Sequence, residues 1–303
     1  MSPVTERFEL APYLRAEAAR VNQALGVAVA EAEALLPAEL QPALRHGLLS
    51  QGKRLRPVLC AAAYHACGGR SPAIAELAVS LELVHAYSLM HDDLPCMDDA
   101  PLRRGRPTTH RVHGEAATAR AGAALILLAA LRAWRGALAI GCDERAAREI
   151  VVELCRAAGA GGMVGGQALD LRAEQAALDG DALDRLHLLK TGALLAAALR
   201  IGALAAGASA VVLDALDRYG RAVGLAFQIA DDLLDATATS EQLGKLPSDS
   251  ERDKTTYVAV HGLEAAAARG RAEVARARAA LDRVGLADPA LHALAEYVVA
   301  RRR

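Results

Sequence analysis

The stretch SLELVHAYSLMHDDLPCMDDAPLRRGRPT, residues 80–108, decides the fold class of this chain and points to its chemistry. Residues 80–90 are almost entirely apolar and continue a helical pattern that begins near residue 72. Pro95 is expected to end that helix near its own position. Two carboxylate pairs and three arginines then follow within a short span: Asp92, Asp93, Asp98, Asp99, Arg103, Arg104 and Arg106. The pattern predicts a buried helix that carries acids to a site at its end.

The same helical periodicity extends over most of the chain. Apolar residues recur at three- and four-residue steps at 12–36, 72–91, 114–139, 143–158, 181–206, 208–236 and 257–283. No stretch combines strand-like alternation with a hairpin turn, so we expect no sheet. Three segments are apolar nearly all round, which predicts central helices covered by others: 77–91, 121–131 and 222–234. The sequence therefore predicts an all-α fold, a single large bundle of mostly antiparallel helices around a central cavity, forming one domain over residues 1–303.

The composition excludes several classes of protein. Hydrophobic residues make up 53 % of the 303 residues but aromatics only 3 %, and Lys+Arg (35) nearly balance Asp+Glu (36). A net charge of -1 gives no general attraction to nucleic acid, so we expect no nucleic-acid partner. Five cysteines without a CxxC pair favour neither a zinc site nor a disulfide framework, and we expect reduced, buried thiols.

The apolar segments do not predict a membrane protein. Residues 121–131 are too short to cross a bilayer, and residues 192–213 are interrupted by Arg200. The first residues contain acids and no continuous apolar core, so they do not resemble a signal peptide. We therefore expect a soluble, cytoplasmic protein without a membrane span.

The two carboxylate pairs after residue 91 predict a site for a hard divalent cation. Close carboxylates repel one another, and Mg²⁺ prefers such oxygens together with water and phosphate. A solvated acidic turn is the alternative for one isolated cluster. A second cluster in GLAFQIADDLLDA (224–236) favours the metal site, because acids on an apolar helix are costly to bury without a cation. It contains Asp231, Asp232 and Asp235, with Gln228 one turn earlier near the same line.

Basic residues lie close to the acids in sequence. GKRLRP (52–57) supplies Lys53, Arg54 and Arg56, and His85 precedes the first acids on the same helix. Arginine forks and lysine charges are common grips for phosphate. Taken singly, the arginines could form a solvated turn and His85 could be a packed core histidine. Because these basic residues occur together with the aspartate clusters, we expect one diphosphate held through metal ions and a second held by basic side chains alone.

Two further segments interrupt apolar helices. Lys190 and Thr191 in LLKTGALL either reach the surface or face the anionic cavity. The glycines of residues 159–170 fit neither a P-loop nor a dinucleotide fingerprint and predict a close helix approach or a kink, with Gln167 and Asp170 pointing inward. The long polar stretch 238–256 is our candidate for a functional loop.

These segments together resemble a known family. HDDLPCMDD…LRRGRPT (91–108) and FQIADDLLD (227–235) are similar to the two aspartate-rich motifs of the trans-isoprenyl diphosphate synthases. Other landmarks of that family match in order over most of residues 45–260: GKRLRP, GGQALDL (165–171), KTGALL (190–195) and LGK…DKTTY (243–257). Within the family, the chain looks most like the short-chain bacterial farnesyl diphosphate synthases, also called geranyltranstransferases.

The resemblance implies a magnesium-dependent condensation of isopentenyl diphosphate with dimethylallyl or geranyl diphosphate to give farnesyl diphosphate. It implies a magnesium cluster, with Mn²⁺ as a substitute, on Asp92, Asp93, Asp98, Asp231, Asp232 and Asp235. The allylic diphosphate would also contact Arg103, Lys190 and Lys245, and isopentenyl diphosphate would be held by Lys53, Arg56, His85 and Arg104. Thr191 and Gln228 would stabilise the allylic cation, and a lid over 238–256 would bring in Lys245 and Lys254.

The resemblance also implies a homodimer, and it places control of product length at Tyr87 and Ser88. Three departures from the family pattern are present: Ala123 where an acid is common, Pro101 before the arginine pair, and a short segment GKLPSDSERDK (244–254). Geranyl or geranylgeranyl diphosphate synthase, a terpene cyclase or hydrolase, and a non-catalytic subunit are the alternatives. A cyclase needs no second diphosphate grip, and a non-catalytic subunit is expected to lose one aspartate cluster.

Overall fold

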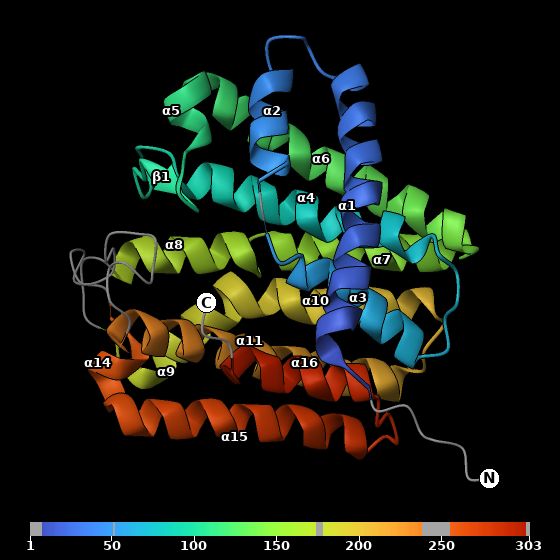
Figure 1. The fold of residues 1–303 in the computed structure, drawn as a ribbon, viewed down its shortest axis with the longest axis vertical. Helices are drawn as coiled ribbons and strands as arrows, with labels where there is room; N and C mark the ends of the chain where they lie inside the picture. Colours follow the sequence, from blue (N-terminus) through green and yellow to red (C-terminus); the bar gives the residue numbers. More distant parts are fainter. Residues whose placement is uncertain (1–7, 51, 174–177, 238–254, 301–303) are drawn as a thin grey trace.

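The chain folds into helices, as the periodicity predicts, and the all-α class is confirmed. The structure, a computed structural model, describes residues 8–50, 52–173, 178–237 and 255–300 (Figure 1). Its elements are α1 (Leu10–Leu35), α2 (Gln41–Leu48), α3 (Leu55–Ala66), α4 (Ile74–Asp92), β1 (Leu102–Arg103), β2 (Arg106–Pro107), α5 (Thr109–His113), α6 (Glu115–Ile140), α7 (Glu144–Ala158), α8 (Met163–Ala173), α9 (Gly180–His187), the π-helix η1 (Leu188–Gly192), α10 (Ala193–Ala205), α11 (Ala210–Thr237), α14 (Tyr257–His261), α15 (Leu263–Asp282) and α16 (Pro289–Ala300).

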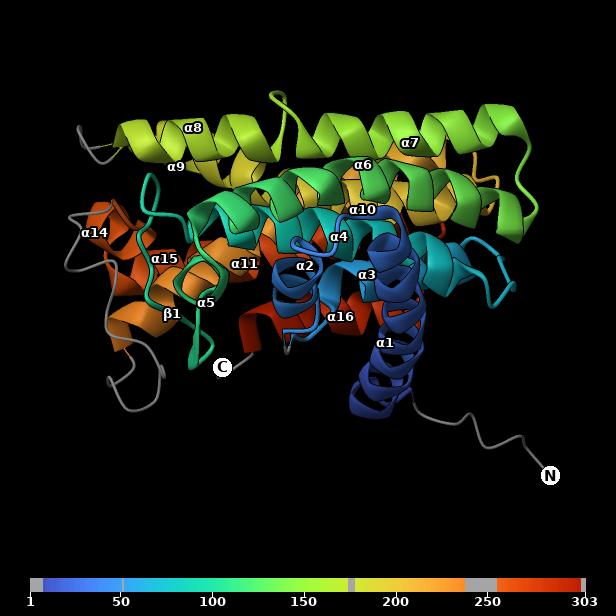
Figure 2. The ribbon, with the colours of Figure 1, turned by 90° about the horizontal axis from the view of Figure 1, so that it is seen from above.

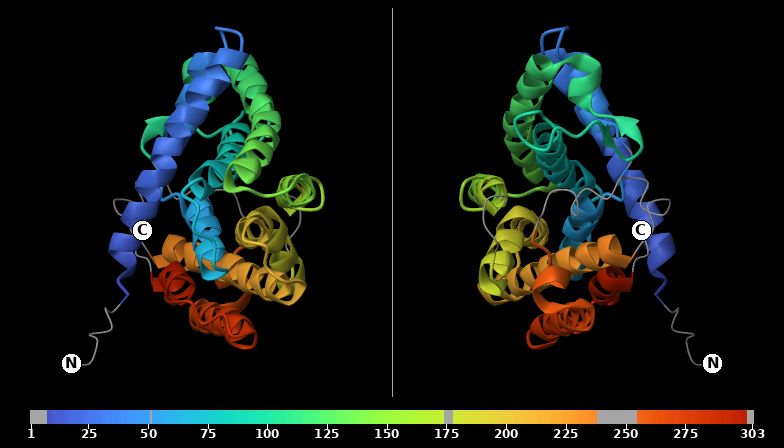
Figure 3. Two further views of the ribbon diagram at one scale, coloured as in Figure 1. Left: turned by 90° about the vertical axis from the view of Figure 1, so that its right-hand side faces the viewer. Right: turned by 90° about the vertical axis from the view of Figure 1, so that its left-hand side faces the viewer.

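The long helices pack side by side in successive layers. α4 runs along α6, α10 lies between α3 and α11, and α11 packs on α15 (Figures 1 and 2). α4 and α6 are antiparallel, because Gly122 near the start of α6 packs on His91 at the end of α4, while Gly136 packs on Leu77 near its start. α1 runs across the other helices along one side of the bundle, as the end-on views show (Figure 3).

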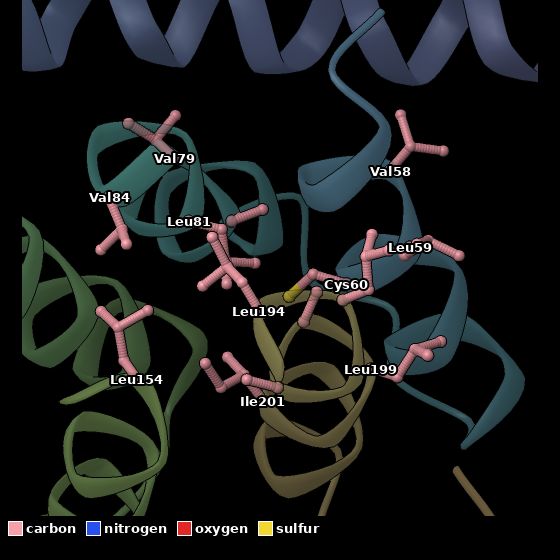
Figure 4. Packing of buried hydrophobic residues seen from close by; sticks show 14 of the residues in the cluster. Val58, Leu59, Cys60, Val79, Leu81, Val84, Leu154, Leu194, Leu199 and Ile201 are labelled. Carbon is pink, nitrogen blue, oxygen red and sulfur yellow. The ribbon is translucent and has the colours of Figure 1, made fainter. Parts of the chain in front are cut away.

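The core is built from small and branched aliphatic side chains that allow close helix approach. α10 lies at its centre, where Leu194, Leu199 and Ile201 meet side chains of α3, α4 and α7 (Figure 4). A Cβ on Gly202 would stand 2.1 Å from the carbonyl oxygen of Cys60, so α10 touches the backbone of α3 there. A core with few aromatic side chains thus follows from the Ala- and Leu-rich composition.

Several predicted boundaries differ from the observed ones. The segment 181–206 is helical but changes at η1 into a π-helix, and the segment 257–283 is broken at Gly262, whose φ of 79° only glycine adopts readily. The prediction that residues 121–131 are covered on all sides is wrong for this chain, since Leu127 is 75 % exposed. The prediction of buried thiols is wrong for Cys96 and Cys155, which are exposed.

The expectation of no sheet is wrong at one place, a two-residue hairpin. β1 and β2 pair antiparallel, with Arg103 opposite Arg106. Arg104 and Gly105 between them have φ of 54° and 73°, the left-handed conformation that a tight type I′ turn requires at both positions. The turn places Arg103 and Arg104 next to the end of α4, where the site lies.

Among the described residues, two helical stretches are long and apolar enough to cross a membrane: Glu115–Ile140 and Gly180–Ala205. The second has 67 % of its most apolar window buried inside the protein, as the central helix of a bundle does. The first has only 33 % of that window buried, so α6 presents an apolar face outward.

Candidate active site

The first aspartate cluster lies in a compact turn after α4. The amide of Asp98 donates to the carbonyl of Asp92 at 2.9 Å, which folds the second pair back on the first. Asp93, expected among the metal ligands, is buried, and both of its oxygens accept from Nε of Arg103 at 2.8 and 2.9 Å. Asp99 turns outward and accepts from Arg111 at 2.9 Å. The structure therefore gives neighbouring acids different partners.

Asp92 carries the perturbed carboxyl of this cluster. Burial, opposed by the charge of Lys190 and reinforced by that of Asp98, raises the pKa of Asp92 to about 6. A carboxylate that burial and a like charge both disfavour is stabilised by a bound cation. A metal ion bound to Asp92 would therefore relieve the cost of burying its charge.

The second cluster lies on α11 and also divides. Asp231 and Gln228 line a large cavity, and Asp235 is exposed one turn beyond Asp231. Asp232 faces another way: it is 7 % exposed and accepts from the backbone amide of Tyr257 at 2.7 Å. The expected metal ligand Asp232 thus fixes the start of α14 through that hydrogen bond.

The cavity has a volume of about 1090 Å³ and lies between α1, α3, α4, the hairpin, α11 and α16. Five cationic side chains and two carboxylates line it in the part of the chain that the structure describes: Lys53, Arg54, Arg56, Arg103, Arg104, Glu82 and Asp231. His85, Thr191, Phe227 and Gln228 complete the wall on its inner side. The predicted basic residues and one predicted acid therefore meet in a single space.

We call the side of the cavity lined by Lys53, Arg56, His85 and Arg104 the cationic wall. Two of its side chains, Arg56 and His85, are perturbed by burial. Burial lowers the pKa of Arg56 to about 10, and the Nε atom of Arg56 is buried without a hydrogen-bond partner. Burial, followed by the charges of Arg56 and Arg104, holds the pKa of His85 well below its usual range, so its imidazole is neutral at pH 7. A buried guanidinium with an unused donor is suited to an anionic ligand.

The π-helix η1 presents Lys190 and Thr191 toward the acids. Nζ of Lys190 donates to Asp170 at 2.6 Å, and Oγ1 of Thr191 donates to Oε1 of Gln228 at 2.9 Å. Glycines make this irregular turn possible: a Cβ on Gly166 would stand 2.2 Å from the amide nitrogen of Lys190. Such single π turns in long helices often occur at functional sites. The predicted close helix approach at residues 159–170 is confirmed.

Comparisons with known proteins identify the family of this chain. Residues 37–283 match the family described as polyprenyl synthetase. The chain belongs to the polyprenyl synthetase family. Members of that family among its relatives are prenyl diphosphate synthases, and the protein is accordingly a transferase of prenyl groups.

The relatives have different products in their names. The farnesyl diphosphate synthase of Escherichia coli (strain K12) is 42 % identical over 292 residues, which is 94 % of this chain and 96 % of the relative. Geranylgeranyl pyrophosphate synthase 9, chloroplastic, of Arabidopsis thaliana is 41 % identical over 302 residues, covering 97 % and 82 % of the two chains. A geranyltransferase structure from Helicobacter pylori, complexed with magnesium and isoprenyl diphosphate, superposes with a TM-score of 0.74 at 32 % identity over 86 % of each chain.

The residues of this polyprenyl synthetase fit a magnesium ion that is shared with its substrate. Among the described residues, no group of three or more His, Cys, Asp or Glu side chains lies close enough to hold a metal alone. Mg²⁺ usually keeps several waters and takes one or two carboxylates together with substrate phosphates. Asp92, Asp98 and Asp231 offer such carboxylates, and a cation would stabilise the ionised form of Asp92, whose pKa is raised by burial.

Tyr87 and Ser88 lie one turn before the acids on α4. The ring of Tyr87 meets His91 edge-on, with centroids 4.7 Å apart, and Ser88 Oγ donates to the carbonyl of His85 at 2.9 Å. Burial and the charge of Asp92 raise the pKa of Tyr87, so its ring lies close to the acids. The geometry is compatible with a ring below the first aspartates, and also with a simple packing role.

Some site residues were not predicted, and some predictions fall outside the described residues. Glu82, Asn22 and Tyr297 line the cavity but carry no motif in the sequence, because their positions depend on the packing of distant helices. Lys53 has its ammonium 5.8 Å from the centre of the Tyr297 ring on α16. Lys245 and Lys254 lie outside the described residues. Of the three departures from the family pattern, Ala123 and Pro101 are exposed, and the segment 244–254 lies outside the described residues.

Proposed function

We propose that this protein condenses isopentenyl diphosphate with an allylic diphosphate, dimethylallyl or geranyl, to give farnesyl diphosphate and free diphosphate. The strongest support is that the cationic wall and Asp231, a carboxylate suited to bind magnesium, line the same cavity of about 1090 Å³. A single-substrate prenyl cyclase needs one diphosphate site, whereas this cavity offers two kinds of anion grip.

The allylic diphosphate is assigned to Asp92, Asp98 and Asp231 through magnesium, with Arg103 and Lys190 beside it. Magnesium bound there would neutralise the leaving diphosphate, and Mn²⁺ is a possible substitute. Asp93 and Asp232 are better suited to orient Arg103 and Tyr257, because the structure gives each of them a direct hydrogen bond to these residues.

Isopentenyl diphosphate is assigned to Lys53, Arg56, His85 and Arg104. Its double bond attacks the allylic carbon as the bond from that carbon to the diphosphate oxygen breaks. The released diphosphate then takes the proton that the new cation loses. The Thr191 hydroxyl and the Gln228 amide, already hydrogen-bonded to each other, lie on the inner wall where their dipoles stabilise the positive charge.

An incubation with product analysis tests this function. Purified protein is given Mg²⁺, isopentenyl diphosphate and dimethylallyl, geranyl or farnesyl diphosphate in turn, and the products are sized by chromatography. A fifteen-carbon product from the first two partners supports the proposal. A twenty-carbon product would make it a geranylgeranyl diphosphate synthase, and a cyclic or hydrolysed product without use of isopentenyl diphosphate would contradict it.

We further propose that the enzyme is a single-domain, cytoplasmic homodimer. The apolar outward face of α6 supports the dimer, because a large apolar patch on a helix is costly to leave in water. The residues of this apolar face recur along α6 at steps of three and four: Ala123, Ile126, Leu127, Ala130, Leu131, Trp134 and Leu138. Leu127 is 75 % and Ile126 39 % exposed in the single chain.

A further inference from the structure

A buried ion pair lies beneath the cationic wall and joins three separate parts of the chain. Arg54 and Glu82 pair directly, and each side chain is 6 % exposed. Nε of Arg54 also donates to Oδ1 of Asn22 on α1 at 2.9 Å, and another nitrogen of its guanidinium donates to the carbonyl of Ser50 at 2.9 Å. Every nitrogen of this guanidinium is therefore engaged with α1, α4 or the end of α2.

The backbone at Arg54 needs this support. Its φ of 52° is left-handed, a conformation that costs about 1 kcal/mol or more for a residue with a side chain. Arg54 stands at the start of α3, directly after Lys53 and two residues before Arg56. The strained residue therefore fixes how the two neighbouring cations enter the cavity.

Glu82 is one of the two carboxylates that line the cavity in the described part of the chain. It lies three residues before His85 on α4, hence on the same face, and its charge raises the pKa of both Arg56 and Arg104 against the effect of burial. Asp231, the other carboxylate among the described lining residues, stands on the α11 wall. Glu82 thus belongs to the cationic wall and not to the metal side.

We propose that Glu82 is a positioning residue for isopentenyl diphosphate, acting through Arg54 to hold residues 52–56 so that Lys53 and Arg56 converge on one diphosphate. This inference rests on the proposed function, which places that substrate at the cationic wall. Glu82 touches no substrate in this account, and its effect reaches the ligand through the backbone of Arg54.

The sign of a charge-removing substitution separates positioning from simple charge balance. Glu82→Gln keeps the size of the side chain and removes a negative charge from beside the anion site. By Coulomb attraction alone, the change should tighten the binding of an anion. If Glu82 positions the wall, the change should instead weaken binding, because misplacing the grips by a fraction of an ångström is costly.

The test is calorimetric titration of isopentenyl diphosphate into the full-length protein with EDTA and no divalent metal, so that the aspartate clusters contribute little. Glu82→Gln and Arg54→Lys are each expected to raise Kd about tenfold or more. Arg54→Lys retains both charges and loses only the forked geometry, so it remains informative if Glu82→Gln folds poorly. In turnover assays, the KM for isopentenyl diphosphate should rise while that for geranyl diphosphate stays within about twofold.

The matched control is Glu31→Gln, which breaks another interhelical pair. Arg132, 8 % exposed, donates to Glu31 at 2.8 Å between α6 and α1, and neither residue lines the cavity. This variant should bind isopentenyl diphosphate like the wild type. Unchanged or tighter binding by Glu82→Gln, or an equal rise in both KM values, would overturn the inference alone. A wild-type protein that binds no isopentenyl diphosphate would overturn the proposed function as well.

Discussion

Neighbouring aspartates of one motif have different interaction partners, because their side chains point in different directions. Asp92 and Asp93 are adjacent, yet Asp93 is paired with Arg103, whereas Asp92 lies close to the charge of Asp98 and has a raised pKa. The sequence shows the cluster and its chemistry but not this division, because consecutive residues at a helix end point in different directions.

Asp92→Asn is expected to stabilise the metal-free protein while abolishing most turnover. Burial raises the pKa of Asp92 from 3.8 to about 6, so the native state binds the proton more tightly than the unfolded chain does. Ionised Asp92 therefore lowers stability, by about 1–3 kcal/mol at a pH well above 6, and this cost fades as the pH falls toward 3.8. Urea unfolding of both proteins in EDTA measures it. An equally stable or less stable variant well above pH 6 would contradict the assignment.

Tyr87→Ala tests whether the ring limits product length. If Tyr87 forms the floor below the acids, the variant stays active and its product shifts from fifteen carbons to twenty or more. If the half-buried ring only fills space beside His91, the variant loses about 1–3 kcal/mol of stability and its product length is unchanged. Chromatography of the products and a thermal melt separate the two. An active variant with an unaltered product would remove this role from Tyr87.

Among elements, the π-helix is the one that the sequence does not predict. The apolar pattern of residues 181–206 indicates one continuous helix, and that continuity is confirmed, but periodicity cannot reveal a single widened turn. The glycines that accommodate it are visible in the sequence, since Gly166 and Gly224 are where the neighbouring helices approach η1. Similarly, RRGR predicts a turn, while its pairing as a hairpin and the contact of Arg103 with Asp93 appear only in the structure.

Gly224→Ala is expected to displace η1 and impair turnover. A Cβ at Gly224 would stand 2.6 Å from Cα of Gly192, so the backbone of η1 must shift, at a cost of about 1–3 kcal/mol. Because Thr191 and Lys190 move with it, kcat should fall by about tenfold or more. Gly26→Ala is the control: no atom lies within 4 Å of its Cβ position in α1, and it should gain about 0.5–1 kcal/mol with normal turnover. Unchanged kinetics in Gly224→Ala would show that η1 tolerates movement.

For the molecule as a whole, the sequence predicts the helical bundle and the presence of acidic and basic side chains in one cavity. It does not predict which helix faces outward. Residues 121–131 look like a covered helix because they are apolar all round, and the single chain leaves one side of them exposed. An apolar pattern predicts that a helix surface is buried. It does not predict whether other helices of the same chain or a second copy of the chain bury that surface.

Leu127→Arg is expected to convert a dimer into a monomer. The substitution places a charge in the centre of the apolar face of α6, which a second copy would have to desolvate. Val211→Arg is the control, because Val211 is similarly exposed, at 66 %, but belongs to α11 and is not a member of that face. Sedimentation velocity of the wild type and both variants gives the result. A wild type that sediments as a monomer at micromolar concentration would contradict the dimer.

The central claim is that one cavity holds two diphosphates by different means. The most direct test is a crystal structure with Mg²⁺, isopentenyl diphosphate and a thiolo analogue of geranyl diphosphate that ionises slowly. We predict one diphosphate bridged by magnesium to Asp92 and Asp231, and a second in contact with Lys53, Arg56 and Arg104 without metal. A single diphosphate shared by both sets of residues, or magnesium bound away from the two aspartates, would contradict it.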